Sequence, residues 1–321
     1  MNARIERIYY HLPVSIQNLL LSIYGYNLQK IRHGRQCHDF LQQIEGRVTL
    51  SKEKLEEIQW KIFSKLLIES KEYVPYYRDA LKGISIQDFN SVNDLQKLPL
   101  LEKSVLRTTP ESLIDERYEK KKLLVVHTTG TTGTPLKIFC SSEARKKNYA
   151  FYSRFLQQAG INYSGKRATF GGRIVVPNDQ DKPPFWRYSF FQKNILFSSY
   201  HLTEKNIPSY ILALRKIKLE YIDSYPSSLF IIAKYAQQQS ISLDGITKAI
   251  TTSAETLFPE QRKVIEDVFG VSVFDQYGAA EMCVFVGQCS HGLYHVHSDY
   301  AIIEFLREDG SPAMPGEEAE V

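Results

Sequence analysis

Apolar residues in the first third of the chain recur at helical intervals. The clearest run has successive gaps of three, four and four positions, which predicts one apolar face of an amphipathic helix. Its members are Leu55, Ile58, Ile62 and Leu66. Proline-stopped turns at 74–78 and 98–100 interrupt this part of the sequence. We expect residues 1–118 to form a mainly helical region that packs on the rest of the chain.

A different pattern begins near residue 119, where short apolar runs alternate with longer amphipathic stretches. The apolar runs have the length and composition of buried strands. They are 123–128, 167–170, 195–199, 221–224, 249–252 and 272–276. This alternation predicts an α/β core over residues 119–321, with layered, mostly parallel sheets and flanking helices. Ligands of such sheets collect beyond the carboxyl ends of the strands.

Capping signals place helices between the predicted strands. Ser142 can cap a helix that Gly160 closes, and Thr203 can cap a second helix. Pro259 suits the first position of a third helix, which Gly270 would end.

Composition narrows the class of protein. Hydrophobic residues make up 43% and charged residues 24% of the 321 residues, which is ordinary for a globular protein. The net charge of +4, from 40 Lys and Arg against 36 Asp and Glu, suits a small anion. It is too weak and dispersed to indicate a nucleic-acid partner. The aromatic share of 12% fits a well-packed core as well as deep apolar clefts.

Cysteine usage and the N-terminus favour a reducing, cytoplasmic location. The four cysteines are too few and too scattered for a disulfide framework. Arg4 and Arg7 precede neither a clean apolar stretch nor a cleavage site, so we expect no signal peptide. The apolar run 19–24 is far shorter than the ~20 residues that span a bilayer. It allows contact with a membrane surface. The oligomeric state stays open.

Segment 128–137 has the composition of an anion-binding loop, with five threonines and two glycines after an apolar strand. Glycine lets the backbone approach a phosphate, while hydroxyl and amide groups donate to its oxygens. We expect Thr128, Thr131 and the cation Lys137 to contact phosphates during catalysis. Pro135 excludes a Walker A loop, which would continue with Gly-Lys. A polar turn between two strands is the alternative.

This loop resembles the phosphate-binding signature of a known enzyme superfamily. Residues 129–135 are similar to the phosphate loop of the adenylate-forming (AMP-binding) enzyme superfamily, which includes the acyl-CoA synthetases. The resemblance implies contacts to the phosphates of ATP from Thr129, Gly130, Thr132, Gly133 and Thr134. Segments 74–78, 98–103 and 225–228 follow in the order typical of the phenylacetate–CoA ligase-like family, and within it the subgroup of capsular polysaccharide biosynthesis.

A second motif strengthens the resemblance. In the family, the tyrosine that matches Tyr277 lies against adenine, and the glutamate that matches Glu281 coordinates Mg²⁺; the cofactor-binding turn between them would include Gly278 and Ala279. Mg²⁺ prefers oxygen ligands and usually takes one or two carboxylates. Ala280 stands where the family usually has Ser or Thr, so one hydroxyl donor is missing. Taken alone, the motif also fits a helix-starting turn with an exposed glutamate.

Two other strand ends carry candidate residues. Ala254 and Glu255 resemble the segment that forms the other side of the adenine pocket, although a helix N-cap at Ser253 explains them equally well. For the acid substrate we expect contacts from His201 and from a segment that follows another strand. That segment is Tyr225, Pro226 and Ser227. A surface histidine ahead of a helix is the alternative for His201.

Cysteines and histidines crowd into the positions after Glu281. Cys283, Cys289 and His295 form a candidate zinc site, because zinc favours sulfur and nitrogen ligands. Against zinc, the segment contains no Cys-x-x-Cys pair. Strand alternation would also put His295 and His297 on one face beside an acyl pocket.

The resemblance implies a function for the chain. It would be the large N-terminal domain of an adenylate-forming ligase, ending before the hinge and the C-terminal lid domain. Such an enzyme binds Mg·ATP and a small-molecule carboxylic acid, forms an acyl-adenylate with release of pyrophosphate, and transfers the acyl group to CoA or another acceptor. The subgroup implies a role in cell-surface polysaccharide biosynthesis.

Two other functions remain open. The chain could be a nucleotide-binding scaffold of the same fold that has lost turnover, which Ala280 favours. It could also be a nucleotide-independent protein of the cell envelope that handles sugars or lipids, which fits the apolar run 19–24.

Overall fold

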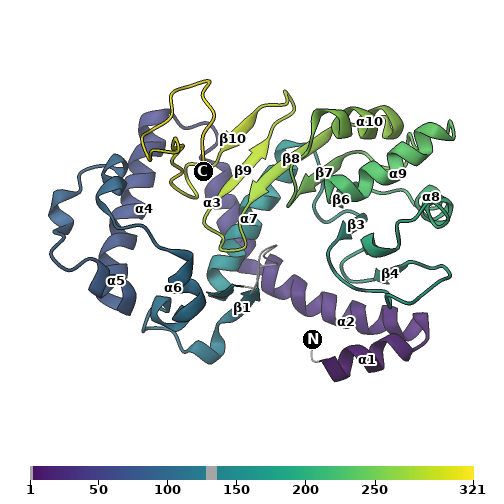
Figure 1. Cartoon of the computed structure of the whole chain (residues 1–321), viewed down its shortest axis with the longest axis horizontal. Helices are drawn as coiled ribbons and strands as arrows, with labels where there is room; N and C mark the ends of the chain where they lie inside the picture. Colours follow the sequence, from purple (N-terminus) through teal and green to yellow (C-terminus); the bar gives the residue numbers. More distant parts are fainter. Residues whose placement is uncertain (1–2, 128–135) are drawn as a thin grey trace. The chain divides into compact units, whose positions relative to one another are not determined.

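A computed structural model describes residues 3–127 and 136–321 (Figure 1). Contacts within the chain divide it into two compact units that interleave along the sequence. Unit 1 comprises Met1–Gly34, Tyr152–Tyr277 and Val286–His295. Unit 2 comprises Arg35–Phe151, Gly278–Phe285 and Val296–Val321. The sequence-predicted division near residue 118 stays a prediction.

A mostly parallel sheet organises unit 1. In the described residues its strand order is β10-β9-β8-β7-β6-β3-β5-β4. The run from β8 to β5 is parallel, and β4 pairs antiparallel with β5. The strands are β3 Arg167–Gly171, β4 Trp186–Ser189, β5 Asn194–Ser198, β6 Tyr221–Ser224, β7 Ile250–Ser253, β8 Val273–Gly278, β9 Phe285–Gln288 and β10 Tyr294–Val296. The predicted α/β fold with a largely parallel sheet is confirmed.

Small and branched apolar residues set the core of unit 1. Ala168 of β3 lies in register with Ile195 of β5 and Ile222 of β6, and all three are buried. Phe170 stacks on Phe197 with ring centroids 4.7 Å apart. Three helices pack against this core, α8 Ile207–Arg215, α9 Pro226–Gln238 and α10 Pro259–Phe269. The remaining helices of unit 1 are α1 Ala3–His11 and α2 Val14–His33.

Helix ends agree with the sequence signals in part. α10 starts at Pro259, and Gly270 follows it with a φ of +66°, as predicted. α7 runs over Ser142–Gln158, but the side chain that accepts from its first turn belongs to Ser141, whose Oγ lies 3.0 Å from the amide nitrogen of residue 144. The predicted cap at Thr203 is wrong. α8 begins at Ile207, because its first turn holds a proline that suits the start of a helix.

Unit 2 is built from helices and one hairpin. The hairpin strands β1 Leu124–His127 and β2 Lys137–Cys140 are antiparallel. The helices are α3 Arg35–Glu45, α4 Lys52–Tyr73, α5 Pro75–Ala80 and α6 Lys103–Thr108. Short 3₁₀ turns join them, η1 Ile86–Asp88, η2 Val92–Lys97, η3 Pro110–Leu113 and η4 Lys120–Lys122. The described residues before position 119 therefore form helices and turns, in line with the predicted helical pattern.

The buried face of α4 differs from the predicted one. Ile62 and Leu66 are 46% and 59% exposed, whereas Phe63 and Leu67 are buried against Phe89 and its neighbours. The helix carries apolar residues at adjacent positions, so its periodicity allows two faces. The aromatic side chain of Phe63 removes more apolar surface from water and decides between them.

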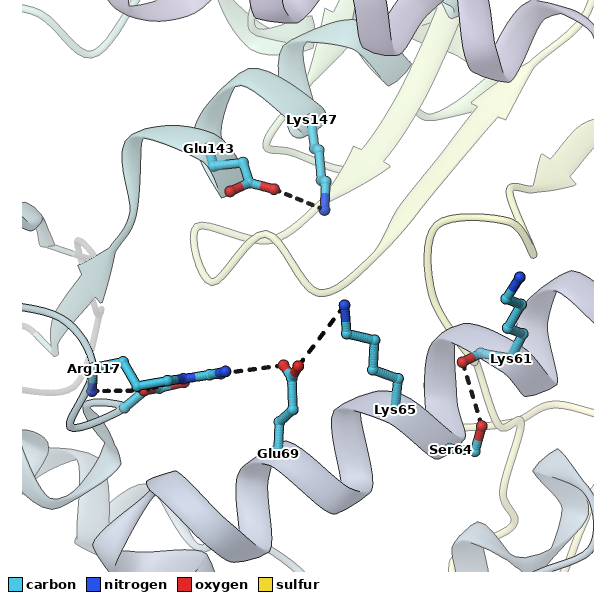
Figure 2. A network of polar contacts seen from close by, with 8 residues as sticks. Lys61, Ser64, Lys65, Glu69, Arg117, Glu143 and Lys147 are labelled. Atoms are coloured by element: carbon cyan, nitrogen blue, oxygen red, sulfur yellow. Dashed lines mark hydrogen bonds and ion pairs between the residues drawn. The ribbon is translucent and has the colours of Figure 1, made fainter.

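A network of charges attaches the loop before η4 to α4. Glu69 of α4 accepts a hydrogen bond from Arg117 at 3.1 Å and lies 3.8 Å from Lys65, as Figure 2 shows. Arg117 also contacts Asp115 and lies over the ring of Tyr73, 4.1 Å from its centroid. The bond to Arg117 lowers the pKa of the Glu69 carboxyl. The network therefore keeps Glu69 charged and fixes the direction of the chain into the hairpin.

Helix α2 docks on β4 through a glycine. A Cβ atom at Gly25 would lie 2.4 Å from Oγ of Ser189, which is fully buried. Alanine normally stabilises the interior of a helix relative to glycine. We predict that Gly25→Ala instead lowers the free energy of unfolding by about 1–3 kcal/mol, because the overpacked contact must move apart.

Urea denaturation checks this prediction with two partner variants. Ser189→Ala removes the clashing oxygen and should recover part of the stability in the Gly25→Ala background. Gly46→Ala is the matched control, since a Cβ there meets nothing within 4 Å. Equal stability of Gly25→Ala and Gly46→Ala would contradict the close docking of α2.

His33 in the last turn of α2 makes stability depend on pH. Its ring stacks on Tyr163 with centroids 5.7 Å apart. Burial, together with the charges of Arg167 and Arg32, lowers the pKa of His33 to about 4. Between this value and the ordinary pKa of 6.5, the unfolded chain binds a proton that the folded chain does not. The folded chain therefore has its full stability with respect to His33 above pH 6.5, and it loses this stability as the pH falls from 6.5 toward 4.

We predict that His33 lowers the free energy of unfolding by about 1–2 kcal/mol when the pH is lowered from 7 to 5. Urea titrations at both pH values should show a smaller pH dependence for His33→Gln than for the unsubstituted chain. The exposed His11→Gln is the control and should keep the full dependence. An unchanged pH dependence in His33→Gln would refute the assignment.

Candidate functional site

The carboxyl ends of β6 and β7 bring two predicted segments together within unit 1. Tyr225 follows β6, and its amide donates to the carbonyl of Phe170 in β3 at 3.0 Å. Ser227 lies in the first turn of α9, and its amide donates to a carboxylate oxygen of Glu255 at 3.0 Å. Glu255 thus acts as a side-chain acceptor for the start of α9, which is favourable at a positive helix end. Pro226, predicted beside them, is buried as the first residue of that helix.

Ala254 adopts an unusual backbone conformation at the end of β7. Its φ is +68°, in the left-handed region that a side chain disfavours. Residues held in this way are enriched at functional sites, where the surrounding structure fixes a special geometry. Here the geometry turns the chain directly after β7 so that Glu255 reaches α9. The predicted N-cap at Ser253 is absent, since that residue ends the strand and α10 starts only at Pro259.

Two further residues at this edge were missed from the sequence. The carbonyl of Gly172, just after β3, accepts a hydrogen bond from the hydroxyl of Tyr200 at 3.0 Å. A Cβ at Gly172 would lie 2.8 Å from the hydroxyl of Tyr225. The pair Gly171-Gly172 directly after an apolar strand was the available signal, because glycine there permits a close approach of another chain segment.

His201 ends the 3₁₀ turn Ser199–His201 ahead of α8, but it is not on the surface. It is 6% exposed, stacks on Phe185 with centroids 5.2 Å apart, and its Nδ1 lies 2.7 Å from Oγ of Ser198 at the end of β5. The surface alternative is therefore wrong. The buried Nε2 has no hydrogen-bond partner among the described residues. Its expected contact with the acid substrate stays a prediction.

A buried carboxylate fixes the strand that ends in Tyr277. Asp275 of β8 accepts a hydrogen bond from the hydroxyl of Thr252 at 2.5 Å and one from Tyr294 at 2.7 Å. Its backbone amide donates to the side chain of Gln288 at 3.2 Å. Burial and the nearby carboxylate raise the pKa of Tyr294 to about 12, so its hydroxyl stays protonated and donates. The network joins four strands two residues before Tyr277, which is 50% exposed.

The turn that carries Glu281 belongs to unit 2 and has its own anchors. The amide of Met282 donates to the carbonyl of Ala279 at 3.0 Å, and Met282 has a φ of +58°. Tyr300 donates to the carbonyl of Met282 at 2.8 Å, and the Met282 sulfur lies 3.4 Å from that of Cys140 at the end of β2. Glu281 itself is exposed. The turn is thus fixed while its carboxylate stays accessible. Gly278, Ala279 and Ala280 precede it in the predicted order.

The phosphate-loop prediction falls largely outside the described residues. These undescribed candidates are Thr128, Thr129, Gly130, Thr131, Thr132, Gly133 and Thr134. The ends of the loop are described, since His127 and Lys137 are cross-strand partners in the hairpin. Lys137 lies 3.6 Å from Glu111 and over the ring of Phe139, 4.9 Å from its centroid. Its contact with a phosphate stays a prediction.

The predicted zinc site is not formed. Within residues 3–127 and 136–321, no group of three or more His, Cys, Asp or Glu side chains is placed to hold a metal ion, and this includes Cys283, Cys289 and His295. Cys289 lies in the turn between β9 and β10, where its backbone pairs with Leu293. His297 is buried between aromatic rings instead of sharing an exposed strand face with His295. A single Mg²⁺ ligand such as Glu281 is a separate prediction that this finding leaves open.

Known proteins resemble the chain in sequence and in fold. No protein-family model matches it. It is 28% identical over 305 residues to protein CapK of Staphylococcus aureus, covering 95% of the chain and 66% of that protein. It is 24% identical over 299 residues to phenylacetate-coenzyme A ligase of Thermus thermophilus, covering 83% and 60%. The chain thus spans less than two thirds of the length of either relative.

Solved structures agree on the fold. A crystal structure of 2-hydroxyisobutyryl-CoA ligase in complex with 2-HIB-AMP and CoA matches with a TM-score of 0.63 at 16% identity, over 83% of this chain and 58% of that one. The same ligase in its postadenylation state matches with a TM-score of 0.64. Identity at this level supports the fold alone. In sequence the chain is similar to protein CapK and to a phenylacetate-coenzyme A ligase, and its fold is similar to that of the solved 2-hydroxyisobutyryl-CoA ligase.

Proposed function

We propose that the chain binds Mg·ATP and a carboxylic acid and supports formation of an acyl-adenylate with release of pyrophosphate. One observation carries the proposal. The segments at 225–227 and 254–255 follow β6 and β7, and Tyr277 lies near the end of the neighbouring parallel strand β8, so all three lie at one edge of one sheet. That edge is where α/β sheets bind their ligands. The relatives named as CoA ligases support the reaction class.

The residues divide into roles by their chemistry. Tyr277 offers an exposed ring for adenine, and Ala254 and Glu255 follow the adjacent strand β7. Glu281 offers an exposed carboxylate for Mg²⁺, and Lys137 a cation for the phosphates. The Mg²⁺ would neutralise phosphate charge. The chain itself would orient the acid for attack on the α-phosphorus, so catalysis would come from positioning and electrostatics.

Further steps extend the same proposal. CoA is the proposed acyl acceptor, because the two ligases that the chain resembles are coenzyme A ligases and one of them binds CoA in its crystal structure. The acid would bind near Tyr225, Pro226, Ser227 and His201. A cytoplasmic location and a role in cell-surface polysaccharide biosynthesis complete the proposal, and both rest on the sequence arguments above.

The residue before Glu281 differs from the pattern of the family that the chain resembles, and this difference favours a second candidate function. Ala280 cannot donate the hydroxyl that relatives of this superfamily place before the Mg²⁺ ligand. A nucleotide-binding scaffold with little turnover would tolerate this loss. Acid-dependent pyrophosphate release from the product of the whole gene, measured over a panel of carboxylic acids, separates the two functions. Nucleotide binding with no such release would favour the scaffold.

The first prediction concerns binding of Mg·ATP. A ligand that binds the folded state at 100 times its Kd stabilises it by about 2.7 kcal/mol, so Mg·ATP should raise the melting temperature by several degrees. Glu281→Gln should remove most of this rise by weakening the Mg²⁺ contact. Glu318→Gln, another exposed acid in unit 2, is the control. Failure of Mg·ATP to change the melting temperature of the unsubstituted chain would reject nucleotide binding.

The second prediction concerns the acid side. Gly172→Ala would push the hydroxyl of Tyr225 away, whereas Gly171→Ala meets its nearest neighbour at an ordinary 3.9 Å. We expect Gly172→Ala to raise KM for the acid at least about tenfold, since misplaced contacts at a binding site cost much of their energy. Gly171→Ala should leave KM unchanged. Steady-state pyrophosphate release on the product of the whole gene measures both, and equal KM values would exclude Tyr225 from the acid site.

A further inference from the structure

Helix α2 turns a polar face toward the protein. Its buried residues are Gln17, Ser22 and Gly25. A helix on the surface of a globular protein usually buries its apolar side. Here the sheet that α2 covers ends in β4, an edge strand with unpaired backbone groups, and these groups need polar partners.

The polar face satisfies that edge. The amide of Tyr188 in β4 donates to Oδ1 of Asn18 at 2.9 Å, and the amide of Phe190 just beyond β4 donates to Oγ of Ser22 at 2.9 Å. Gln17 accepts from the buried guanidinium of Arg187 at 2.5 Å. Figure 1 shows α2 alongside β4. The edge strand therefore fixes the rotation of α2 about its axis.

The opposite side of the helix is apolar and exposed. Its residues fall at i, i+3, i+4, i+7 and i+8, so they share one face. We call them the outer face of α2: Ile16, Leu19, Leu20, Ile23 and Tyr24. Each is at least 41% exposed.

An aromatic turn extends the outer face. Phe190 and Phe191, between β4 and β5, are 65% and 48% exposed. The ring of Phe191 lies 5.2 Å from that of Tyr26 on α2. Tyrosine, with an apolar ring and a polar hydroxyl, suits the interface between water and lipid, and the two phenylalanines add apolar surface beside Tyr26.

Positive charge accompanies this apolar surface. Residues 14–33 contain no Asp or Glu. Lys30 is exposed, with its ammonium 4.5 Å from the ring centroid of Tyr26. A cavity of about 100 Å³ adjoins the aromatic turn, and its lining includes Phe191, Lys193 and Arg167. Lys193 is exposed and adds a second cation, whereas the charge of Arg167 interacts with the carboxylate of Asp223 inside unit 1.

We propose that the outer face of α2 and the turn at 190–193 form a docking surface for an anionic phospholipid bilayer. The apolar side chains enter the interface between headgroups and acyl chains, as amphipathic helices do when they lie in the membrane plane. Lys30 and Lys193 face the lipid phosphates. No helix in the described part of the chain is long and apolar enough to cross a membrane. The contact is therefore a peripheral one.

Charge argues against a second copy of the chain as the occupant. A partner copy would present the same helix, which lacks acidic residues and offers no carboxylate to Lys30. An anionic bilayer supplies the missing negative charge over the whole surface.

Flotation of the full chain with lipid vesicles tests the proposal. We expect binding to vesicles of equal parts phosphatidylcholine and phosphatidylglycerol, and about tenfold weaker binding to pure phosphatidylcholine. Leu19→Glu should lower binding to the anionic vesicles at least about tenfold, because a charge replaces an inserted apolar group. Ile23→Glu is an independent substitution on the same face. Lys30→Glu should reduce the preference for anionic over neutral vesicles about fivefold or more.

Leu212→Glu is the matched control. Leu212 is an apolar residue of α8 in the same unit and, like Leu19, it is 59% exposed. The control should bind vesicles as the unsubstituted chain does, and all variants should keep its melting temperature. Absent binding by the unsubstituted chain would overturn the proposal, and so would binding of Leu19→Glu and Ile23→Glu that is as tight as that of the unsubstituted chain. Light scattering that shows a dimer lost in Leu19→Glu, without vesicle binding, would assign the face to a second copy instead.

Discussion

Parallel hydrogen bonding between β5, β3, β6, β7 and β8 is the constraint on which the site depends. Parallel strands have all their carboxyl ends at one edge, so the residues that follow them meet there although they are far apart in the sequence. Gly172, Tyr225 and Ala254 come from three such ends. The buried Asp275 then links β8 to its neighbours close to Tyr277. These hydrogen bonds hold the end of β8 in place, and Tyr277, the proposed adenine contact, lies there.

Local backbone geometry adjusts what the sheet positions. Ala254 and Met282 both have positive φ, one at the end of β7 and the other beside Glu281. Such conformations cost about 1–3 kcal/mol each and persist where surrounding contacts enforce them. The contacts here are the carboxylate of Glu255 on α9 and the hydroxyl of Tyr300 on Met282. Each turn is therefore defined within its own unit, and each belongs to a segment that the superfamily resemblance assigns to nucleotide or metal binding.

The open edge of the same sheet has a different consequence. β4 would expose backbone amides, and α2 supplies acceptors for them through Asn18 and Ser22. Because the polar side of α2 packs on the edge strand, its apolar side faces away from the sheet and is exposed. The proposed membrane contact and the fold of unit 1 thus have one cause, which is the need to satisfy buried backbone groups.

The sequence by itself predicted the strands β1, β3, β5, β6, β7 and β8, but not β2, β4 and β9, and it predicted where α10 starts and ends. Short apolar runs and the pair Pro259 and Gly270 depend on local chemistry, so these predictions succeeded. The motifs also predicted a resemblance to the adenylate-forming enzymes, with which the similarity to CapK and to a phenylacetate-coenzyme A ligase agrees. Only the tertiary structure decided which side of α4 and α2 is buried, that His201 lies in the core, and that Cys283, Cys289 and His295 form no metal cluster. Periodicity identifies an apolar face but not the surface that it meets, and that surface is set by contacts between residues distant in the chain.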